Sequence, residues 1–383
     1  MKKKTILHII TGLGDGGAEG VLSRLCLNSA NFKHEVISLT DEGKYGPTLR
    51  SAGINVRCLH LSYSFKFFID FIKMIYWIRQ TSPDVVQTWM YHADFVGGLA
   101  ARIAGIKSIL WNVRMTSFLP IHGKARTKVL IKICAISSRF IPKKIIYCAN
   151  SALKYHLENG YCDKKSLVIY NGFDLNLFKY TKKDKISIIN GIHIKSKYFL
   201  LGMVARFDVL KDHNNLFHAL SMTRSQGIQF KCLLVGNNMD YNNDKIVQLI
   251  KQYNLEDCII LIGPYSNIAK IMNCIDLHIL SSSSEGFPNV IAESMACGTP
   301  CISTDVGDAK IIINDEAMCC SANDPESLSS LIIDCYYEWK NSPKNWEKRK
   351  LNCAKRIKKN FSLRRMIKNY SNIWIKISTA GEL

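Results

Sequence analysis

Short apolar runs alternate with helical patterns along most of the chain, and this alternation limits the possible folds more than any other feature. The first examples are TILHII at 5–10, a helical pattern at 18–28 and HEVISL at 34–39. Nearly continuous apolar strands separated by helices are typical of a parallel sheet covered on both faces. The alternation is lost before residue 198 and restarts with YFLLGMVA at 198–205. The sequence therefore predicts an α/β protein with two doubly wound units in tandem.

The break in this alternation predicts the domain boundaries. A chain of 383 residues is long for one domain and natural for two. Residues 179–197 are polar, charged and weakly patterned, so we expect a first domain at 1–180, a linker at 181–197 and a second domain at 198–359. The terminal segment 360–383 contains a helical pattern whose apolar face must pack against another part of the protein: Met366, Ile367, Tyr370, Ile373, Trp374 and Ile377.

The charge balance indicates anionic partners. Lys and Arg number 51 against 31 Asp and Glu, which gives a net charge of +20. Phosphorylated small molecules and anionic lipid headgroups fit this balance, and a solvated basic surface is the simplest alternative. We expect no nucleic-acid partner, because no recognised binding module is present. The 14 cysteines include no CxxC pair, which favours reduced thiols in a cytoplasm over a disulfide scaffold or a zinc site.

One helical pattern raises the question of a membrane. The N-terminal MKKKTILHII is too short for a signal peptide, and no stretch reaches the roughly 18 apolar residues that span a bilayer. FKFFIDFIKMIYWIR at 65–79 comes closest, with Lys66, Asp70 and Lys73 on one helical face. We expect a largely buried helix. The alternative is a helix on a membrane surface, which the basic segment 122–144 would support.

A glycine-rich turn follows the first predicted strand. Gly12, Gly14 and Gly17 match G-x-G-x-x-G, and Asp41 at the end of the second strand could bind a ribose. Alone, this motif would indicate a nicotinamide-dependent oxidoreductase. A plain tight turn, or another phosphate or sugar site, fits it as well.

The second half of the chain contains a larger cluster of candidate ligands. Arg206 and Lys211 follow strand 198–205, and this pair of cations suits a diphosphate. EGFPNVIAESMACG, from Glu285 to Gly298, follows a strand of the same predicted sheet and contains a helix that Pro288 starts and Gly298 ends. A helix start favours an anion, whereas carboxylates accept hydrogen bonds from hydroxyls. Glu293 could thus hold a ribose and Glu285 a second sugar, and the ligand so described is a nucleoside diphosphate sugar.

These residues resemble those of a known family. EGFPNVIAESMACGTPCISTDVG, at 285–307, is similar to the E-x7-E signature of the retaining glycosyltransferases of family 4. Those enzymes have the GT-B fold, in which two Rossmann-like domains face each other across a cleft. GLGDGGAE, NGFDLNLF at 171–178 and VARFDVLKD with its Arg-x4-Lys spacing support the resemblance, which covers roughly residues 5–325.

The resemblance implies a role for each matching residue. Glu293 looks like the acid that binds the nucleotide ribose, and Glu285 looks like the acid near the donor sugar. Arg206 and Lys211 look like the pair that neutralises the diphosphate. Backbone N–H groups would assist from a segment that we also assign to donor binding: Gly286, Phe287, Pro288, Asn289 and Val290.

The resemblance extends to the first domain. Gly16 and Gly17 look like the loop that meets the donor phosphate or the acceptor, and His92 is similar to a histidine beside the transferred sugar. Arg114, after strand 108–113, is a weaker candidate for acceptor binding. The helix in 360–383 would pack back on the first domain. One departure is VGDAKIII, where Asp308 and Lys310 replace the usual glycine pair and glutamate.

The expected activity is transfer of a sugar from a UDP- or GDP-linked donor to an acceptor hydroxyl, with no cofactor. No convincing DxD motif appears, which is consistent with a metal-independent enzyme. The charge favours a lipid-linked saccharide as acceptor, at the anionic inner face of the cytoplasmic membrane, in O-antigen or capsule synthesis. Alternatives are a silent sugar-nucleotide-binding subunit, the oxidoreductase named above and a non-hydrolysing epimerase.

Overall fold

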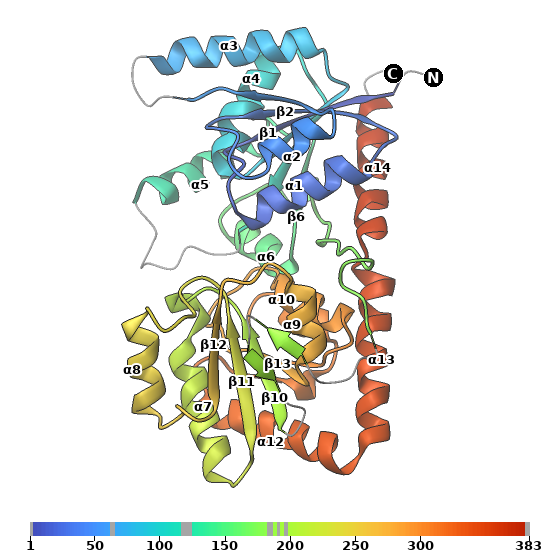
Figure 1. The fold of residues 1–383 in the computed structure, drawn as a ribbon. Helices are drawn as coiled ribbons and strands as arrows, with labels where there is room; N and C mark the ends of the chain where they lie inside the picture. Colours follow the sequence, from blue (N-terminus) through green and yellow to red (C-terminus); the bar gives the residue numbers. More distant parts are fainter. Residues whose placement is uncertain are drawn as a thin grey trace. The chain divides into compact units, whose positions relative to one another are not determined.

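The computed structural model divides into two compact units (Figure 1). Unit 1 comprises Met1–Gly172 and Arg364–Leu383, and unit 2 comprises Phe173–Leu363. The structure describes residues 3–61, 66–115, 125–181, 187–189, 192–194 and 198–379.

Unit 1 is built on a parallel sheet with strand order β3-β2-β1-β4-β5-β6-β7. Strands β1, β2, β4 and β5 are almost entirely buried, as their apolar sequences predicted, whereas the edge strand β3 is only partly buried. The strands are β1 (Thr5–Ile10), β2 (Lys33–Ser38), β3 (Asn55–Cys58), β4 (Val85–Trp89), β5 (Ile109–Val113), β6 (Lys144–Tyr147) and β7 (Ser166–Val168). The helices are α1 (Gly17–Asn28), α2 (Gly46–Ser51), α3 (Lys66–Thr81), α4 (Gly98–Ile103), α5 (Ala125–Ser137), α6 (Asn150–Glu158) and α14 (Leu363–Thr379), with a π-helical turn η1 (Ala93–Gly97) and a 3₁₀ turn η2 (Asp163–Lys165).

Unit 2 repeats this architecture with strand order β12-β11-β10-β13-β14-β15, again all parallel. The strands are β10 (Phe199–Val204), β11 (Phe230–Val235), β12 (Ile259–Gly263), β13 (Leu277–Leu280), β14 (Cys301–Thr304) and β15 (Cys319–Cys320), beside a small antiparallel pair, β8 (Ser187–Ile189) and β9 (Ile192–Ile194). The helices are α7 (His213–Ser225), α8 (Asp244–Gln252), α9 (Ile268–Cys274), α10 (Asn289–Ala296), α11 (Ala309–Ile313), α12 (Pro325–Asn341) and α13 (Pro343–Asn360), with short turns η3 (Val209–Lys211) and η4 (Glu316–Met318).

The strand order reverses once in each sheet. In unit 1, β1 lies between β2 and β4, so the chain leaves β1 in one direction and β4 in the other. In unit 2, β10 lies between β11 and β13 in the same way. Loops that diverge at such a point leave a crevice at the carboxyl ends of the two strands, where open α/β sheets bind ligands.

Helix α14 belongs to unit 1 and closes its core. Its predicted apolar face is buried at Met366, Tyr370, Trp374 and Ile377. Trp374 Nε1 donates to Gln87 Oε1 at 2.7 Å, and Asn112 Nδ2 donates to the Tyr370 hydroxyl at 2.8 Å. Buried polar groups on β4 and β5 thus find their partners on α14, so the helix satisfies hydrogen bonds as well as burying apolar area.

A directed chain of hydrogen bonds lies beneath α14. An indole N–H only donates, so the 3.2 Å bond from Trp89 Nε1 makes Nδ1 of His8 an acceptor. His8 Nε2–H then donates to His34 Nδ1 at 3.0 Å, and His34 Nε2–H donates to Ser29 Oγ at 2.8 Å. Ser29 Oγ completes the chain by donating to Leu25 O. Both imidazoles are therefore neutral.

These hydrogen bonds decide whether a nearby cluster of residues could bind a metal ion. Ligand atoms of His8, Cys26 and His34 lie within 4.8 Å of one another. Nε2 of His8 carries the proton that bonds His34, so its lone pair is not available to a metal ion. Burial raises the pKa of the Cys26 thiol, which keeps it protonated. We interpret the cluster as part of the core.

Helix α3 is less buried than we predicted. Only Asp70, Met74 and Ile78 are buried among the residues that the structure describes in it, whereas Phe68, Ile69, Ile72 and Tyr76 are each 62–66% exposed. The expectation of a largely buried helix was therefore wrong, because apolar residues are exposed together with Lys66 and Lys73, while the charged residue Asp70 is buried. None of the described helices is long and apolar enough to cross a membrane.

The boundary between the units also differs from the prediction at residue 180. Phe173 N donates to Phe361 O and Leu363 N donates to Phe173 O, both at 2.9 Å, and the Phe173 ring stacks on Phe287. These contacts place residues 173–180 in unit 2. Within the predicted linker, β8 and β9 are described, and residues 182–186, 190–191 and 195–197 lie outside the described part.

The buried histidines predict a pH-dependent stability. Burial lowers the pKa to about 4 in His34, His156 and His213, to about 3 in His278, and well below the ordinary value in His8. The unfolded chain protonates near pH 6.5, so it binds more protons than the folded protein below that pH. Stability should be complete above about pH 6.5 and fall toward pH 4, by up to about 1.4 kcal/mol per pH unit for each histidine.

Thermal unfolding followed between pH 8 and pH 4 measures this effect. The exposed His218 serves as a control, since His218→Gln should leave the pH dependence unchanged. A midpoint that stays constant from pH 7 to pH 5 would show that the buried rings do not control stability.

Candidate functional site

The candidate site of unit 2 lies at its reversal of strand order. Arg206 follows β10, and Glu285 follows the neighbouring β13. Because parallel strands bring their carboxyl ends to one edge, the two loops meet there. The sequence separates these loops by more than 70 residues, and the sheet brings them together.

Asp208 organises the loop that carries both cations. Its Oδ1 accepts from Leu210 N–H and its Oδ2 accepts from Arg206 Nε, each at 3.0 Å. Partial burial alone would raise the pKa of this carboxyl, but the two hydrogen bonds and the charge of Arg206 hold it below the usual value. The Arg206 side chain is 66% exposed, so its remaining N–H groups face solvent.

The serine tract after β13 joins the two loops. Ser281 Oγ donates to the carbonyl of Lys211 at 2.9 Å, and Ser283 N–H donates to the carbonyl of Leu210 at 2.9 Å. Ser282 Oγ donates to Glu285 Oε1 at 2.8 Å. The tract Ser281–Ser284, which looks like low complexity in the sequence, therefore holds the Lys211 loop against the Glu285 loop.

Lys211 and Glu285 form an ion pair. Lys211 Nζ lies 2.5 Å from Glu285 Oε1, and the two side chains are only 21% and 14% exposed. Oε1 thus receives both the ammonium and the Ser282 hydroxyl, while Oε2 has no hydrogen-bond partner in the described residues. This pairing was not predicted, since the two residues were expected to hold different parts of the ligand. It orients Glu285 and leaves one oxygen for a hydroxyl.

Two buried histidines adjoin this ion pair. Burial and the nearby charge of Lys211 lower the pKa of His213 to about 4 and that of His278 to about 3. His278 Nε2 accepts from Val204 N–H at 3.4 Å, which agrees with a neutral ring. Both rings are therefore neutral at neutral pH, and neither imidazole competes with Arg206 or Lys211 for an anion.

Helix α10 begins where the sequence predicted. Pro288 occupies the N-cap, the helix runs from Asn289 to Ala296, and Gly298 follows with a φ of +77°. Glu293 is half-buried on this helix, and Phe287 just before it is buried against Phe173 and Phe361. The first-turn N–H groups and the positive end of the helix dipole lie next to Glu285 in the chain, so the start of α10 suits an anion.

The loop after β14 packs against the Glu285 loop. Asp308 N–H donates to the carbonyl of Gly286 at 2.9 Å, and Asp308 is buried. A Cβ on Gly307, whose φ is +58°, would lie 2.3 Å from Gly286 O. Lys310 is bound to Asp305 at 2.7 Å. The loop that carries Asp308 and Lys310 thus contacts the Glu285 loop through the backbone of Asp308.

In unit 1 the predicted glycine-rich loop leads directly into helix α1. Gly16 is the N-cap of α1 and Gly17 is its first residue. A Cβ on Gly16 would lie 2.2 Å from Glu19 Oε2, so the Glu19 carboxylate covers the start of α1. Burial raises the pKa of Glu19, against the opposing effect of the backbone N–H groups and of Arg114. Glu19 is a candidate site residue that the sequence analysis did not name.

Arg114 lies near that helix start, whereas His92 follows a different strand. Arg114 Nη2 donates to Asn171 Oδ1, the guanidinium stacks over Trp89, and buried Nη1 has no hydrogen-bond partner in the described residues. His92 follows β4 and has an exposed side chain whose partial desolvation lowers its pKa. His92 follows β4 and Arg114 follows the neighbouring strand β5. Arg114 is held by its contacts with Asn171 and Trp89.

The close contact at Gly307 predicts a local effect on the site. Gly307→Ala forces a Cβ against the carbonyls of Gly286 and Glu285, so it should destabilise the fold by about 1–3 kcal/mol and displace the Glu285 loop. Gly227→Ala is the matched control, because Gly227 has a φ of +76° and no atom within 4 Å of its Cβ. Thermal unfolding and nucleotide affinity compare the two. Equal losses in both variants would show that only the positive φ matters.

Comparison with known proteins agrees with this architecture. Residues 184–352 match the family described as Glycosyl transferases group 1, and residues 15–177 match Glycosyltransferase Family 4. A crystal structure of Anabaena HepE in complex with UDP has a TM-score of 0.80 and 20% identity, over 99% of this chain and 100% of that one.

Two enzymes with similar sequences have substrates stated in their names. One is the Campylobacter jejuni N-acetylgalactosamine-N,N'-diacetylbacillosaminyl-diphospho-undecaprenol 4-alpha-N-acetylgalactosaminyltransferase, 28% identical over 77% of this chain and 79% of its own length. The other is the Escherichia coli UDP-Gal:alpha-D-GlcNAc-diphosphoundecaprenol alpha-1,3-galactosyltransferase, 24% identical over 72% of each chain. The two halves of this chain match the two domains of one enzyme class, and the protein is a glycosyltransferase of family 4 with the GT-B fold.

Proposed function

We propose that this glycosyltransferase retains the anomeric configuration of a sugar that it moves from a nucleotide donor to an acceptor hydroxyl. The observation that carries the proposal is the meeting of Arg206, the Lys211–Glu285 ion pair and the start of α10 at one edge of the sheet. Two cations and a helix start suit a diphosphate, and the carboxylates suit hydroxyls on either side of it.

The donor is a UDP-linked sugar. UDP is the ligand in the HepE complex, and the name of the E. coli relative specifies UDP-Gal, whereas a GDP-linked donor has no such support. Glu293 binds the ribose, and the free Oε2 of Glu285 accepts a hydroxyl of the transferred sugar. The backbone N–H groups of Gly286, Phe287, Asn289 and Val290 assist at the phosphates, while Pro288, which has no N–H, starts the helix. Analysis of the anomeric configuration of the product by NMR tests retention.

Catalysis comes from stabilising the departing diphosphate as the glycosidic bond breaks. Arg206 and Lys211 supply the positive charge, and no divalent ion takes part in the proposed step. The acceptor hydroxyl loses its proton to the leaving phosphate on the same face. In this step the C1–O bond to the diphosphate breaks, a new C1–O bond forms, and UDP leaves with the proton.

The acceptor is a lipid-linked saccharide. Both relatives named above act, by their names, on sugars carried by diphospho-undecaprenol. Arg114, whose Nη1 is buried without a partner in the described residues, and His92 are the unit 1 residues that we assign to acceptor binding. We assign Gly16 and Gly17, at the start of α1, to the donor phosphate. A role in surface polysaccharide synthesis, such as O-antigen or capsule, follows from such an acceptor.

The alternatives are less well supported. Gly12, Gly14, Gly17 and Asp41 would suit an oxidoreductase, but family membership does not favour one. A silent binding subunit would bind UDP and show no turnover. An epimerase would convert the donor without any acceptor, so product analysis distinguishes all three from a transferase.

The enzyme acts at the inner face of the cytoplasmic membrane through one surface of unit 1. The chain moves in the same direction from β3 to β4, β5 and β6, so right-handed crossovers put α3, α4 and α5 on one face of the sheet (Figure 1). Arg79 Nη2 of α3 donates to the carbonyl of Ile103 at the end of α4 at 3.1 Å. This face exposes large apolar side chains: Phe68, Ile69, Ile72, Tyr76, Leu99, Ile103, Val129, Ile133, Ile136 and Phe140.

Exposed cations accompany these apolar residues. Lys66, Lys73 and Arg79 lie on α3, and Lys128 and Lys132 lie on α5. Apolar side chains enter the interfacial region of a bilayer while cations contact anionic headgroups, and the two contributions add. This combination supports an anionic lipid surface as the partner of the face.

Two acidic residues test the donor assignment. Glu293→Ala should weaken UDP binding by about tenfold or more, because a charge-assisted hydrogen bond to the ribose is lost. Glu285→Ala should mainly reduce turnover with a UDP-sugar and a polyprenyl-diphosphate-linked acceptor. Thermal shift with UDP measures affinity, since ligand binding stabilises the fold. The exposed Glu256→Ala is the control. Equal loss of UDP affinity in both site variants would contradict the assignment.

The membrane assignment predicts binding to anionic vesicles. The protein should sediment with phosphatidylglycerol vesicles at low salt and much less with phosphatidylcholine vesicles. Ile69→Ser combined with Ile72→Ser should weaken binding by about tenfold or more, since two exposed apolar side chains lose their insertion energy. Tyr241→Ser, at an exposed apolar residue of unit 2, should have no effect. A protein that never sediments with anionic vesicles would refute the assignment.

A further inference from the structure

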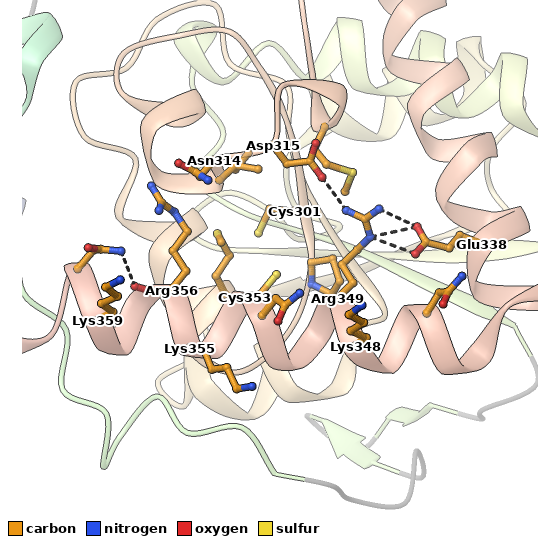
Figure 2. Close-up of a pocket in the computed structure, with 17 residues that line it drawn as sticks. Cys301, Asn314, Asp315, Glu338, Lys348, Arg349, Cys353, Lys355, Arg356 and Lys359 are labelled. Carbon is orange, nitrogen blue, oxygen red and sulfur yellow. Dashed lines mark hydrogen bonds and ion pairs between the residues drawn. The ribbon is translucent and has the colours of Figure 1, made fainter.

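A cavity of about 710 Å³ lies in unit 2 beside α13 (Figure 2). Its walls come from α13, the end of α10, the start of β14 and the segment after α11. Lysine, arginine and asparagine dominate the lining, and two acidic residues contribute to it. The function proposed above uses none of these side chains.

The cavity is separate from the donor site. Met295 near the end of α10 lines it, whereas Glu285 and Pro288 precede the start of that helix. Glu293, the donor-site residue on α10 itself, precedes Met295 by two residues, and residues two apart on a helix are rotated by about 200°, so the two side chains lie on different faces of α10. Cys301, the first residue of β14, also lines the cavity and marks the amino end of a strand. The donor site lies at the carboxyl ends.

Both acidic residues of the lining are neutralised within the wall. Arg349 Nη1 lies 2.9 Å from Asp315 Oδ2, and Arg349 Nη2 lies 2.9 Å from Glu338 Oε2, as Figure 2 shows. Arg356 Nε donates to the carbonyl of Ile312 at 2.6 Å. The two arginines therefore fix the wall in place, and the remaining charge of the lining is that of its lysines.

Those lysines form a stripe along α13. Lys348, Asn352, Lys355 and Lys359 are spaced by four, three and four residues, which puts them on one side of the helix. In the described part of the chain, neither Lys348 nor Lys355 has an ion-pair partner, and both are exposed. A solvated basic face would need no hollow beside it, whereas here the stripe borders a cavity large enough for a small molecule.

We propose that this cavity binds a phosphorylated sugar at a second site, distinct from that of the nucleotide donor. Lys348 and Lys355 supply the charge for a phosphate group. Asn314 and Asn352 present amide donors and acceptors to sugar hydroxyls. The proposal goes beyond the transfer reaction, because a ligand here contacts neither Lys211 nor Glu285.

Calorimetric titration with glucose 6-phosphate tests the proposal. It is done on Lys211→Gln, in which the donor site has lost a cation, as well as on the wild type. Both proteins should bind the probe. Adding Lys348→Gln and Lys355→Gln should weaken binding by about tenfold or more. Adding Lys251→Gln and Lys358→Gln, which remove two exposed cations outside the cavity, should leave the affinity within about twofold.

Three results would overturn the proposal. One is the absence of binding to Lys211→Gln at about 10 mM probe, which corresponds to an affinity too weak for a built site. Another is an equal loss in the cavity and control variants, which would indicate non-specific charge attraction. The third is equal affinity for inorganic phosphate, which would show that the asparagines recognise no sugar. Neutral glucose should bind at least about tenfold more weakly than its phosphate.

Discussion

The reversal of strand order at the centre of each sheet is the constraint on which the rest of the site depends. Strands β1 and β4 in unit 1, and β10 and β13 in unit 2, are neighbours whose connections run in opposite directions. The backbone at these edges cannot be covered by the following helices, so polar side chains and helix starts collect there. Every donor-binding residue that we assign in unit 2 lies on a loop or helix that follows β10 or β13. The order in which the strands are connected therefore determines where the donor-binding residues lie.

Much of this architecture could be predicted from the sequence. The apolar strands, the helix bounded by Pro288 and Gly298, and the placement of Arg206 and Glu285 at strand ends all follow from local patterns that the tertiary structure does not override. Such patterns are reliable where a parallel strand is buried on both faces, since most of its side chains are then apolar.

The contacts that complete the site could not be predicted in this way. The ion pair between Lys211 and Glu285 joins residues far apart in sequence, and its geometry depends on serines whose role is invisible without the fold. Burial of α3 was predicted wrongly because a helical wheel gives the faces of a helix but not which face meets the sheet. Glu19 was missed because an acid in the first turn of a helix is common and marks no site by itself.

The position of α14 has a consequence for how the protein is made. Trp374 and Tyr370 complete a core that is otherwise formed by strands from the first half of the chain. The rings of His8 and His34 on these strands pack against Trp374. During synthesis at roughly 5–20 residues per second, Gln87 and Asn112 wait about 13–57 s for their partners on α14, which follow 287 and 258 residues later. Until then Gln87 and Asn112 lack their hydrogen-bond partners, and Trp374 and Tyr370 do not yet cover the core. Unit 1, whose strands leave the ribosome first, therefore cannot complete its core until unit 2 has been synthesised.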